Sequence, residues 1–527
     1  MMERPMRTIY ALTGVPPEVQ AYAMAKYSRS RQSMRQSIAE LSTQRAEQFL
    51  ESFYFQYGHR SIADLAHVAL AVENISILAA IAVVDQPLWD GQERSTRYQD
   101  FARTGYYTPD AILTTQECEA YTGAADALFE TYAALSKELT TLLVAHVPRP
   151  ETMTEAEHTR TLRARAFDVT RALLPLATIT SVGQITSART LERQISELLS
   201  SPLAETQQIG TDLRAACRTP ATDPAADAVQ AVLASFDGTH LDNDDSRSAL
   251  DALAHAMPHT PVAPTLVKYA APINYHIETA RVFAEAATIL LADISTDLSA
   301  PTVTLAPAAP PVDELIATLL YQHDPAQHSY SAILTAVSVL PATVKDALVD
   351  RSTQLRGPYD DLLRAHRVGA PVQFDLVLDI GSFRDFHRHR RCVQIFPAFS
   401  AQHGTDDAKQ WFTRGLGEAA ATRADETGLI ARYTGALAAT EAAIAAITPA
   451  HPEESAYLLP MAYRCRALFK MDYAEAAYII EQRTALGGHF SYRHAAWQMY
   501  EALRARDPAM TRHIRVTPPS EVDLLRR

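Results

Sequence analysis

The sequence predicts a helix-rich α+β protein made of two tandem copies of one unit, which form a pseudo-dimer within the chain. Helical spacing of apolar residues runs through long stretches, among them 17–57, 116–147 and 413–447. β-like runs are short and few, and residues 372–380 (VQFDLVLDI) alternate well enough to form a strand. An internal repeat is the third observation, and it indicates the two copies.

A short motif that recurs in both halves defines the repeat. Residues 171–175 read RALLP and residues 456–460 read AYLLP, and a helical run follows each motif. Each motif ends in proline, at Pro175 and Pro460, so the two align without a gap. A polar, charged cluster precedes each motif, at 92–98 in the first half and at 384–391 in the second. Because the parts occur in the same order, we infer duplication and fusion of an ancestral subunit.

Two stretches between the halves have linker composition. Residues 219–228 are small, polar and proline-bearing, and residues 299–311 are rich in proline and alanine. Residues 231–291 between them have a mostly helical pattern. We therefore expect three parts: a first domain at 1–218, a helical connector and linker at 219–311, and a second domain at 312–527.

Composition limits the classes of function. The net charge of −13 argues against a general nucleic-acid binder, but a local arginine cluster can still hold a small anion. No apolar stretch is long enough to span a bilayer, and MMERPMRTIY lacks the apolar core of a secretory signal. The four cysteines are widely spaced, which argues against disulfides and zinc knuckles. We therefore expect a cytoplasmic protein without membrane or nucleic-acid partners.

The densest charged cluster is at 384–391, RDFHRHRR, with four arginines and two histidines in eight residues. Such a group repels itself unless an anion or carboxylates lie nearby, and arginine forks match phosphate oxygens. The cluster is therefore a candidate phosphate or pyrophosphate site. The alternative is a solvated basic helix face paired with acidic residues. His387 and His389 are two residues apart, which does not favour a metal pair, and we predict no metal site.

Two polar clusters in the first half are further candidates. In 91–98 (GQERSTRY), Ser95 and Arg97 can both bind one phosphate while Glu93 orients an arginine or a base. An ordinary polar loop is the alternative interpretation. In 57–64 (YGHRSIAD), the polar residues stand at a helix start, which is a ready anion site, and plain capping is the alternative.

Two arginines on later helical segments are candidates for reaching a shared anion. Arg189 lies in TSARTL and Arg483 ends DYAEAAYIIEQR. A single helix arginine is more often a surface residue. Phosphate-loop, dinucleotide-loop, zinc-protease and nucleophile-elbow motifs are all missing from the sequence.

Together these motifs resemble the flavin-dependent thymidylate synthases, over most of 20–210 and 310–500. That family is marked by R-H-R-x-x-S-x-x-x-x-S-x-R, usually followed by tyrosine. An upstream G-H-x-[ST]-x-x-E element and a downstream L-P segment leading to N-x-R accompany it. The first copy has G-H-x-S-x-x-D at 58–64 and E-x-S-x-R-Y at 93–98, but Asp85-Gln86-Pro87 where R-H-R is expected.

The second copy complements the first. It keeps R-H-R at Arg388, His389 and Arg390 but loses the later serines and the final arginine. The arginine of N-x-R corresponds to Arg189 in the first copy and to alanine in the second, whereas a later arginine corresponds to Arg483 only in the second. The resemblance therefore implies a composite site with Arg388, His389 and Arg390 on one wall and Glu93, Ser95 and Arg97 on the other.

The resemblance also implies the chemistry. FAD would be the cofactor, NADPH and methylenetetrahydrofolate the co-substrates, and dUMP or a similar nucleotide the substrate, with no side-chain nucleophile. The cofactor-binding candidates are Arg388, His389, Arg390, His59 and Ser61. The substrate-binding candidates are Glu93, Ser95, Arg97, Arg384, Arg189 and Arg483.

The family forms homotetramers, so a homodimer of fused chains would resemble a pseudo-tetramer. Two alternatives stay open. One is an FAD enzyme acting on a different nucleotide or one-carbon substrate, and the other is a non-catalytic binding or regulatory relative of the same fold.

Overall fold

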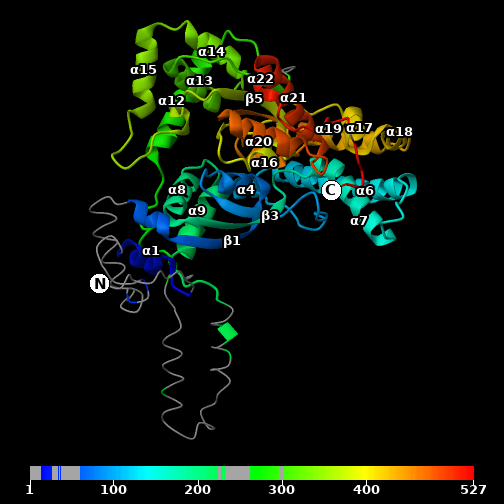
Figure 1. Cartoon of the computed structure of the whole chain (residues 1–527), viewed down its shortest axis with the longest axis horizontal. Coiled ribbons are helices and arrows are strands. Elements are labelled where there is room, and N and C mark those ends of the chain that lie inside the picture. The colour runs from blue at the N-terminus through cyan, green and yellow to red at the C-terminus, as the bar shows by residue number, and fades with distance from the viewer. Residues whose placement is uncertain are drawn as a thin grey trace, which may run out of the picture.

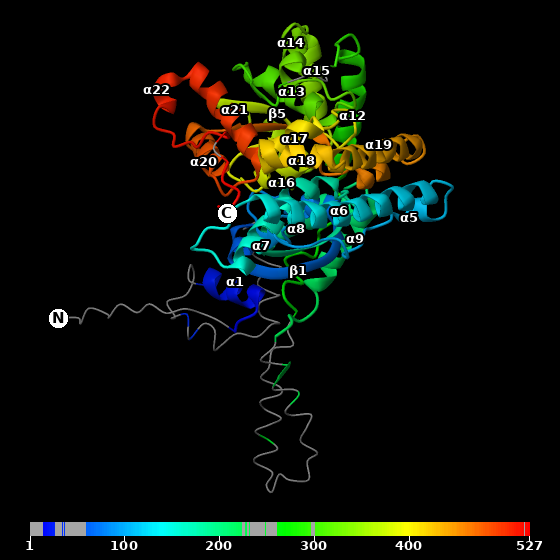
Figure 2. The same ribbon diagram turned by 90° about the vertical axis from the view of Figure 1, so that its right-hand side faces the viewer.

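The computed structural model describes residues 14–26, 60–223, 261–296, 301–520 and 522–526, with Met34, Gln36, 227–228, 231 and 248 as isolated positions. Two copies of an antiparallel sheet, each with its helices, pack against each other (Figure 1). The two copies lie side by side in both views, and helices of both copies project together from one side of the molecule (Figure 2). The helix-rich α+β class predicted from the sequence is therefore confirmed.

The first copy is built around a three-stranded sheet of order β1-β3-β2. β3 (Ile179–Ser187) is the central strand and pairs with β1 (His67–Ser76) and β2 (Asp90–Glu93). Its helices are α1 (Pro17–Lys26), η2 (Arg60–Leu65), α4 (Ile77–Val84), α5 (Asp110–Leu113), α6 (Cys118–His146), α7 (Glu155–Thr170), η3 (Arg171–Leu173), α8 (Ala188–Leu199) and α9 (Ala204–Ala216).

The second copy has a four-stranded sheet of order β4-β5-β7-β6. Its strands are β4 (Val303–Leu305), β5 (Val372–Asp379), β6 (Val393–Ile395) and β7 (Arg464–Met471). Its helices are α12 (Asn274–Leu290), α13 (Pro311–His323), α14 (Tyr330–Ser338), α15 (Ala342–Thr353), η4 (Arg364–His366), α16 (Ile380–Phe386), α17 (Ala408–Leu416), α18 (Glu418–Glu426), α19 (Leu429–Ile447), η5 (Glu454–Leu458), α20 (Tyr473–Thr484), α21 (Phe490–Arg506) and α22 (Pro508–Thr511).

The repeat motifs meet at a local two-fold axis. Pro175 and Pro460 form an isolated antiparallel bridge. Beside it, Leu176 N donates to Leu459 O at 2.9 Å. Met461 N donates to Leu174 O at 3.0 Å, which is the same bond with the two copies exchanged. An interface that exchanges identical contacts is isologous, so the tandem duplication is confirmed. A second such pair joins Ala177 N to Tyr457 O (2.7 Å) and Ala462 N to Ala172 O (2.8 Å).

One apolar core serves both copies. The largest cluster of buried side chains includes Phe167 and Leu173 from the first copy with Phe383 and Leu458 from the second. Trp411 crosses the boundary as well, since its Nε1 donates to Val169 O at 3.1 Å. Because the same buried area belongs to both copies, separating them would expose the core to water.

The two sheets differ in how their outer faces are covered. All eight residues of β5 are buried, whereas β1 alternates between buried and exposed positions. α13 lies over the second sheet, where its Glu314 lies 2.7 Å from Lys470 Nζ of β7. Within the sheet, Arg466 of β7 pairs with Asp375 of β5 at 2.8 Å. Covered on both faces, β5 needs no polar face toward water.

Some sequence predictions differ from the structure in detail. The helix predicted at 413–447 is divided into three, because Gly417 (φ 80°) and Gly428 (φ 75°) adopt positive φ, where a helix cannot continue. The linker predicted at 299–311 was wrong at Val303–Leu305, which forms β4 beside β5. The domain boundaries themselves stay predictions.

Other predictions are tested only in part. Within the helix predicted at 17–57, the described residues form α1 at Pro17–Lys26, and nearly all the rest lies outside the described residues. Within 231–291, α12 is helical, 261–273 is not, and most of 231–260 is outside the described residues. In the part of the chain that is described, no helix is long and apolar enough to cross a membrane.

We predict that Leu173→Ala lowers the free energy of unfolding of the whole chain by about 2–5 kcal/mol, because this fully buried side chain leaves a cavity in the shared core. Urea titration followed by tryptophan fluorescence and circular dichroism should show one transition shifted as a unit. Leu88→Ala, at a side chain that is 74% exposed, is the control. Two separate transitions, only one of them shifted, would contradict the shared core.

Candidate functional site

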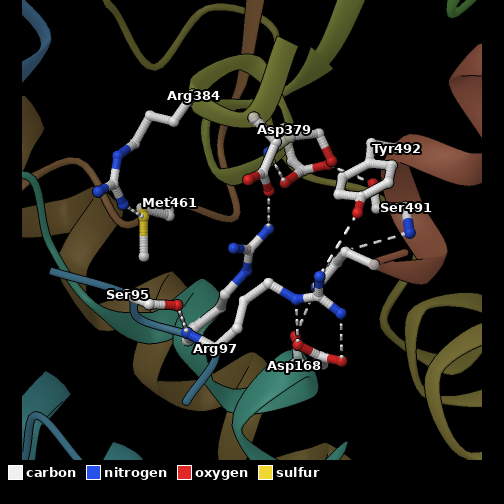
Figure 3. A network of polar contacts seen from close by, with 12 residues as sticks. Ser95, Arg97, Asp168, Asp379, Arg384, Met461, Ser491 and Tyr492 are labelled. Carbon is white, nitrogen blue, oxygen red and sulfur yellow. Dashed lines mark hydrogen bonds and ion pairs between the residues drawn. The ribbon is translucent and has the colours of Figure 1, made fainter. Parts of the chain in front are cut away.

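Charged side chains from both copies meet beside the local two-fold axis (Figure 3). Arg384, on α16 of the second copy, forms an ion pair with Glu93 at the end of β2 in the first copy. Arg384 Nη1 also contacts Met461 Sδ at 3.0 Å. Both charged side chains are less than a tenth exposed, so this pair joins the two sequence clusters inside the protein.

Arg97 is held by groups from both copies. Its Nε and Nη2 donate to the two carboxylate oxygens of Asp168 on α7, at 2.8 and 3.2 Å. Nη2 also donates to the carbonyl of Gly487, and Nη1 lies 3.4 Å from the Tyr492 hydroxyl, both in the second copy. A two-point carboxylate contact fixes the plane of a guanidinium. Arg97 is therefore a rigid, buried cation, and Ser95 lies next to it with Oγ accepting from Arg97 N at 3.3 Å.

A second ion pair crosses the boundary behind the first. Arg171 Nη2 lies 3.0 Å from Asp385 Oδ2, and both side chains are largely buried. Burial alone would raise the pKa of Asp385, but the nearby guanidinium groups of Arg171, Arg388 and Arg483 outweigh burial and hold that pKa well below its usual range. Asp385 therefore stays ionised and balances the arginines around it.

His389 is neutral and has a fixed tautomer. Burial, followed by the charges of Arg483 and Arg390, lowers the pKa of His389 to about 3. Arg483 Nε donates to His389 Nε2 at 2.8 Å, which places the ring hydrogen on Nδ1. Arg483 also donates to the carbonyl of Asp385 at 2.5 Å and lies over the ring of Tyr492. Arg483 therefore holds the R-H-R segment in place from α20.

The two outer arginines of R-H-R point to different surroundings. Arg388 is exposed to solvent. Arg390 is half-buried, with its guanidinium 4.3 Å from the ring centroid of Trp89, and its Nε has no hydrogen-bond partner. Both retain donors for an anion, which suits phosphate groups.

The structure does not bring every sequence candidate to this cluster. Arg189, at the start of α8, pairs with Asp64 at 3.1 Å, and both side chains are more than two-fifths exposed. Ser61 is exposed on η2, a 3-10 helix, rather than at the start of an α-helix. His59 lies outside the described residues. Arg189 and Arg483 thus have different partners within one chain.

The equivalent cluster on the other side of the axis has lost its charges. β2 and β6 pair with equivalent positions of the central strands β3 and β7, which makes Asp90 equivalent to Val393. Counting back from these two positions makes Asp85-Gln86-Pro87 equivalent to R-H-R. The other replacements are Glu93 by Phe396, Ser95 by Ala398, Arg97 by Ser400, Arg171 by Ala456, Arg384 by Ile81, Asp385 by Ala82 and Arg483 by Leu198.

One hydrogen bond is kept on both sides with its charge exchanged. Ser76 caps α4, and its hydroxyl donates to Glu205 on α9 at 2.6 Å. Its equivalent Asp379 caps α16 and accepts from Ser491 on α21. Each pair thus has one carboxylate and one hydroxyl. In the first copy the carboxylate is on α9 and the hydroxyl caps α4, whereas in the second copy the carboxylate caps α16 and the hydroxyl is on α21.

Sequence reasoning missed several members of the cluster. Asp168 and Arg171 come from the α7–η3 segment, and His489 reaches the same place by contacting the Asp168 carbonyl through Nε2 at 2.8 Å. One feature of the sequence could have indicated Arg171, because the first motif, RALLP, begins with arginine where the second, AYLLP, begins with alanine. No such feature indicated Asp168, Tyr492 or His489. Among the described residues, no group of three metal-ligating side chains is found.

Comparison with known proteins gives a family match over both copies. The model of the family described as "Thymidylate synthase complementing protein" matches residues 12–219 and 369–509. Over the full length, a UPF0159 protein of Chlamydia pneumoniae is 24% identical, with 98% of this chain and 93% of the relative covered. UPF0159 proteins of Chlamydia muridarum (23%; 98% and 93%) and Thermoplasma acidophilum (22%; 92% and 93%) are similar to it as well. Each of these alignments therefore spans both copies of this chain.

We predict that Asp379→Asn stabilises the protein more at pH 7 than at pH 4. Burial raises the pKa of Asp379 to about 6, whereas an unfolded aspartate titrates near ~3.9. The wild type therefore loses stability as the pH rises through this window, by roughly 3 kcal/mol, and asparagine has no proton to lose. Urea titrations of both proteins from pH 4 to 7 measure the difference. A difference that is constant with pH would contradict the raised pKa.

Proposed function

We propose that this chain, which belongs to the thymidylate synthase complementing protein family, methylates dUMP to dTMP at one composite site per chain. FAD would be its cofactor, with NADPH and methylenetetrahydrofolate as co-substrates. The observation that carries the proposal is the contact between Arg384, on the helix that leads into R-H-R in the second copy, and Glu93 of the first-copy E-x-S-x-R segment.

The residues of the R-H-R segment suit a bound flavin nucleotide. Arg388 reaches solvent, and Arg390 keeps an unpartnered Nε beside Trp89. Guanidinium donors of this kind match the diphosphate of FAD. His59 and Ser61 are proposed as its contacts from the G-H-x-S segment. When bound, FAD supplies the hydride that completes the methyl group.

The first-copy wall suits the nucleotide. Asp168 fixes the plane of Arg97, and the Ser95 hydroxyl lies beside it, so a phosphate group can be held without reorganising the site. Glu93 is positioned by Arg384 in a largely buried pair. We assign Arg384 to positioning, since its guanidinium is already engaged by Glu93 and Met461.

Arg483 and His389 act on the pyrimidine side in this proposal. Arg483 is a cation held between the His389 ring and the Tyr492 ring. A fixed cation near the uracil carbonyls stabilises negative charge that develops when C5 attacks the one-carbon unit. His389 stays neutral over the physiological range and keeps Arg483 oriented. Ser95 has no histidine as a partner and is no nucleophile.

We further propose that two chains associate into a homodimer resembling a tetramer of single-copy subunits. The motivation is that Ser61 and Arg189 remain exposed, away from the buried cluster. A flavin enzyme acting on another nucleotide is the second candidate, because Val393, Ala398 and Ser400 replace the serines and arginine expected after R-H-R. A non-catalytic relative is the third candidate, because Asp85-Gln86-Pro87 has no arginine where R-H-R is expected.

We predict that purified protein binds FAD and that dUMP then perturbs the flavin absorption band. Arg388→Ala should abolish FAD uptake, because it removes a guanidinium that would donate hydrogen bonds to the FAD phosphates. Arg97→Met should leave FAD bound but weaken dUMP binding about 10- to 100-fold, the value of a charge-assisted hydrogen bond. Arg103→Met, at an exposed arginine nearby, is the control. A colourless protein that takes up no FAD would refute the enzyme proposal.

We also predict that dUMP titrates to one site per chain in calorimetry of the FAD-bound protein. The reason is that the equivalent cluster has lost its arginines, Arg97 and Arg483 being replaced by Ser400 and Leu198. Light scattering gives the number of chains in the same sample. A ratio of two dUMP per chain would show that the uncharged side still binds nucleotide.

A further inference from the structure

A cavity lies where the Asp85–Pro87 loop of the first copy meets the second copy. It is a small space that opens to solvent. The second copy lines it with η4 and with residues 387–394, contributing Arg364, Arg367 and Arg390. Arg97, Glu93 and Arg384 do not line it, but Arg390 of the R-H-R segment lies at its border.

The cavity has more cations than acids. Asp85 is the acid in its lining, and Arg364 engages it twice, at Oδ1 (2.6 Å) and at the backbone carbonyl (2.5 Å). Arg367 is exposed, and neither it nor Arg390 forms an ion pair with a carboxylate in the described part of the chain. Nearby Glu197 is itself paired with an arginine of its own helix. Because our proposed function assigns Arg390 to FAD, Arg367 is the guanidinium in this lining that is left to attract a further anion.

A buried histidine faces the cavity with an unused acceptor. Gln394 Nε2 donates to the carbonyl of His389 at 2.6 Å, so its Oε1 accepts from His387 Nδ1 at 2.5 Å. Burial lowers the pKa of His387, which keeps the ring neutral. Nε2 then has a bare lone pair, without a hydrogen-bond partner and 3.6 Å from Asp85. A buried acceptor of this kind needs a hydrogen-bond donor from another group.

The local symmetry says what this cavity replaces. η4 precedes β5 as η2 precedes β1, and Asp85-Gln86-Pro87 is the equivalent of R-H-R. The cavity is therefore the counterpart of the place where R-H-R faces the G-H-x-S segment, which is the cofactor site in our proposed function. The placement of the charges is reversed. The loop that corresponds to R-H-R carries an acid, Asp85, and the arginines Arg364 and Arg367 lie on and directly after η4.

We propose that this cavity binds a phosphate group, held by Arg364 and Arg367, with the Asp85 carboxylate as its built-in competitor. A hydrogen-bearing phosphate oxygen would satisfy His387 Nε2. The assignment as a counterpart rests on the proposed function, but phosphate binding does not require catalysis.

The test is calorimetric titration of the full-length protein with inorganic phosphate and, separately, with AMP, at constant ionic strength. Arg367→Gln should weaken binding of the probe about tenfold, because it removes one cation. Asp85→Asn should strengthen it about tenfold, because Arg364 loses its internal carboxylate. Arg351→Gln, at an exposed arginine of α15, should leave the affinity unchanged. Circular dichroism melting confirms that each variant is folded.

The two probes identify the source of the phosphate. Tighter binding of AMP would indicate a nucleotide, and equal or weaker binding would indicate free phosphate. Unchanged affinity in both Arg367→Gln and Asp85→Asn would overturn the proposal. Loss of phosphate binding on saturation with FAD would also overturn it, since the cavity would then belong to the cofactor site. Phosphate binding without FAD binding would refute the proposed function and would still support the phosphate site.

Discussion

The antiparallel backbone contact between the two L-P motifs is the constraint on which the rest of the structure depends. Four hydrogen bonds, related in pairs, join residues 172–177 to residues 457–462. They fix the orientation of the two copies, and the shared core around Phe167 and Phe383 keeps it. With both sheets placed by this contact, the end of β2 necessarily faces α16, and Glu93 meets Arg384.

Fusion removes the requirement that both copies stay identical. In a symmetric dimer a substitution appears at both equivalent sites, whereas in a fused chain each side changes alone. The charged cluster around Arg97 and Asp385 is kept on one side, and apolar residues such as Ile81 and Phe396 replace its members on the other. A buried charge without its partner is costly, so loss of one member favours loss of the rest. The Asp85–Arg364 pair shows another outcome. Here the acid lies in the loop that corresponds to R-H-R, and the arginine lies on η4.

Burial decides the chemistry available to the retained cluster. Desolvation disfavours charge, yet the carboxylate of Asp168 outweighs burial and raises the pKa of Arg97. Arg171 pairs with Asp385 in the same way. His389 has cations around it and becomes neutral. The result is a rigid set of fixed charges and one neutral ring, which suits binding and polarising a nucleotide and a flavin more than side-chain nucleophilic attack.

The sequence alone determined the fold class, the duplication and the split motifs, because periodicity, motif order and the alignment of the two L-P motifs are properties that can be read along the chain. It also pointed to both walls of the cluster. Only the tertiary structure decided that Asp168, Tyr492 and His489 complete the cluster and that Arg189 does not contact it. Those contacts join residues far apart in the chain, and no local pattern encodes which of many acids and aromatic residues the packing of two copies will bring to one arginine.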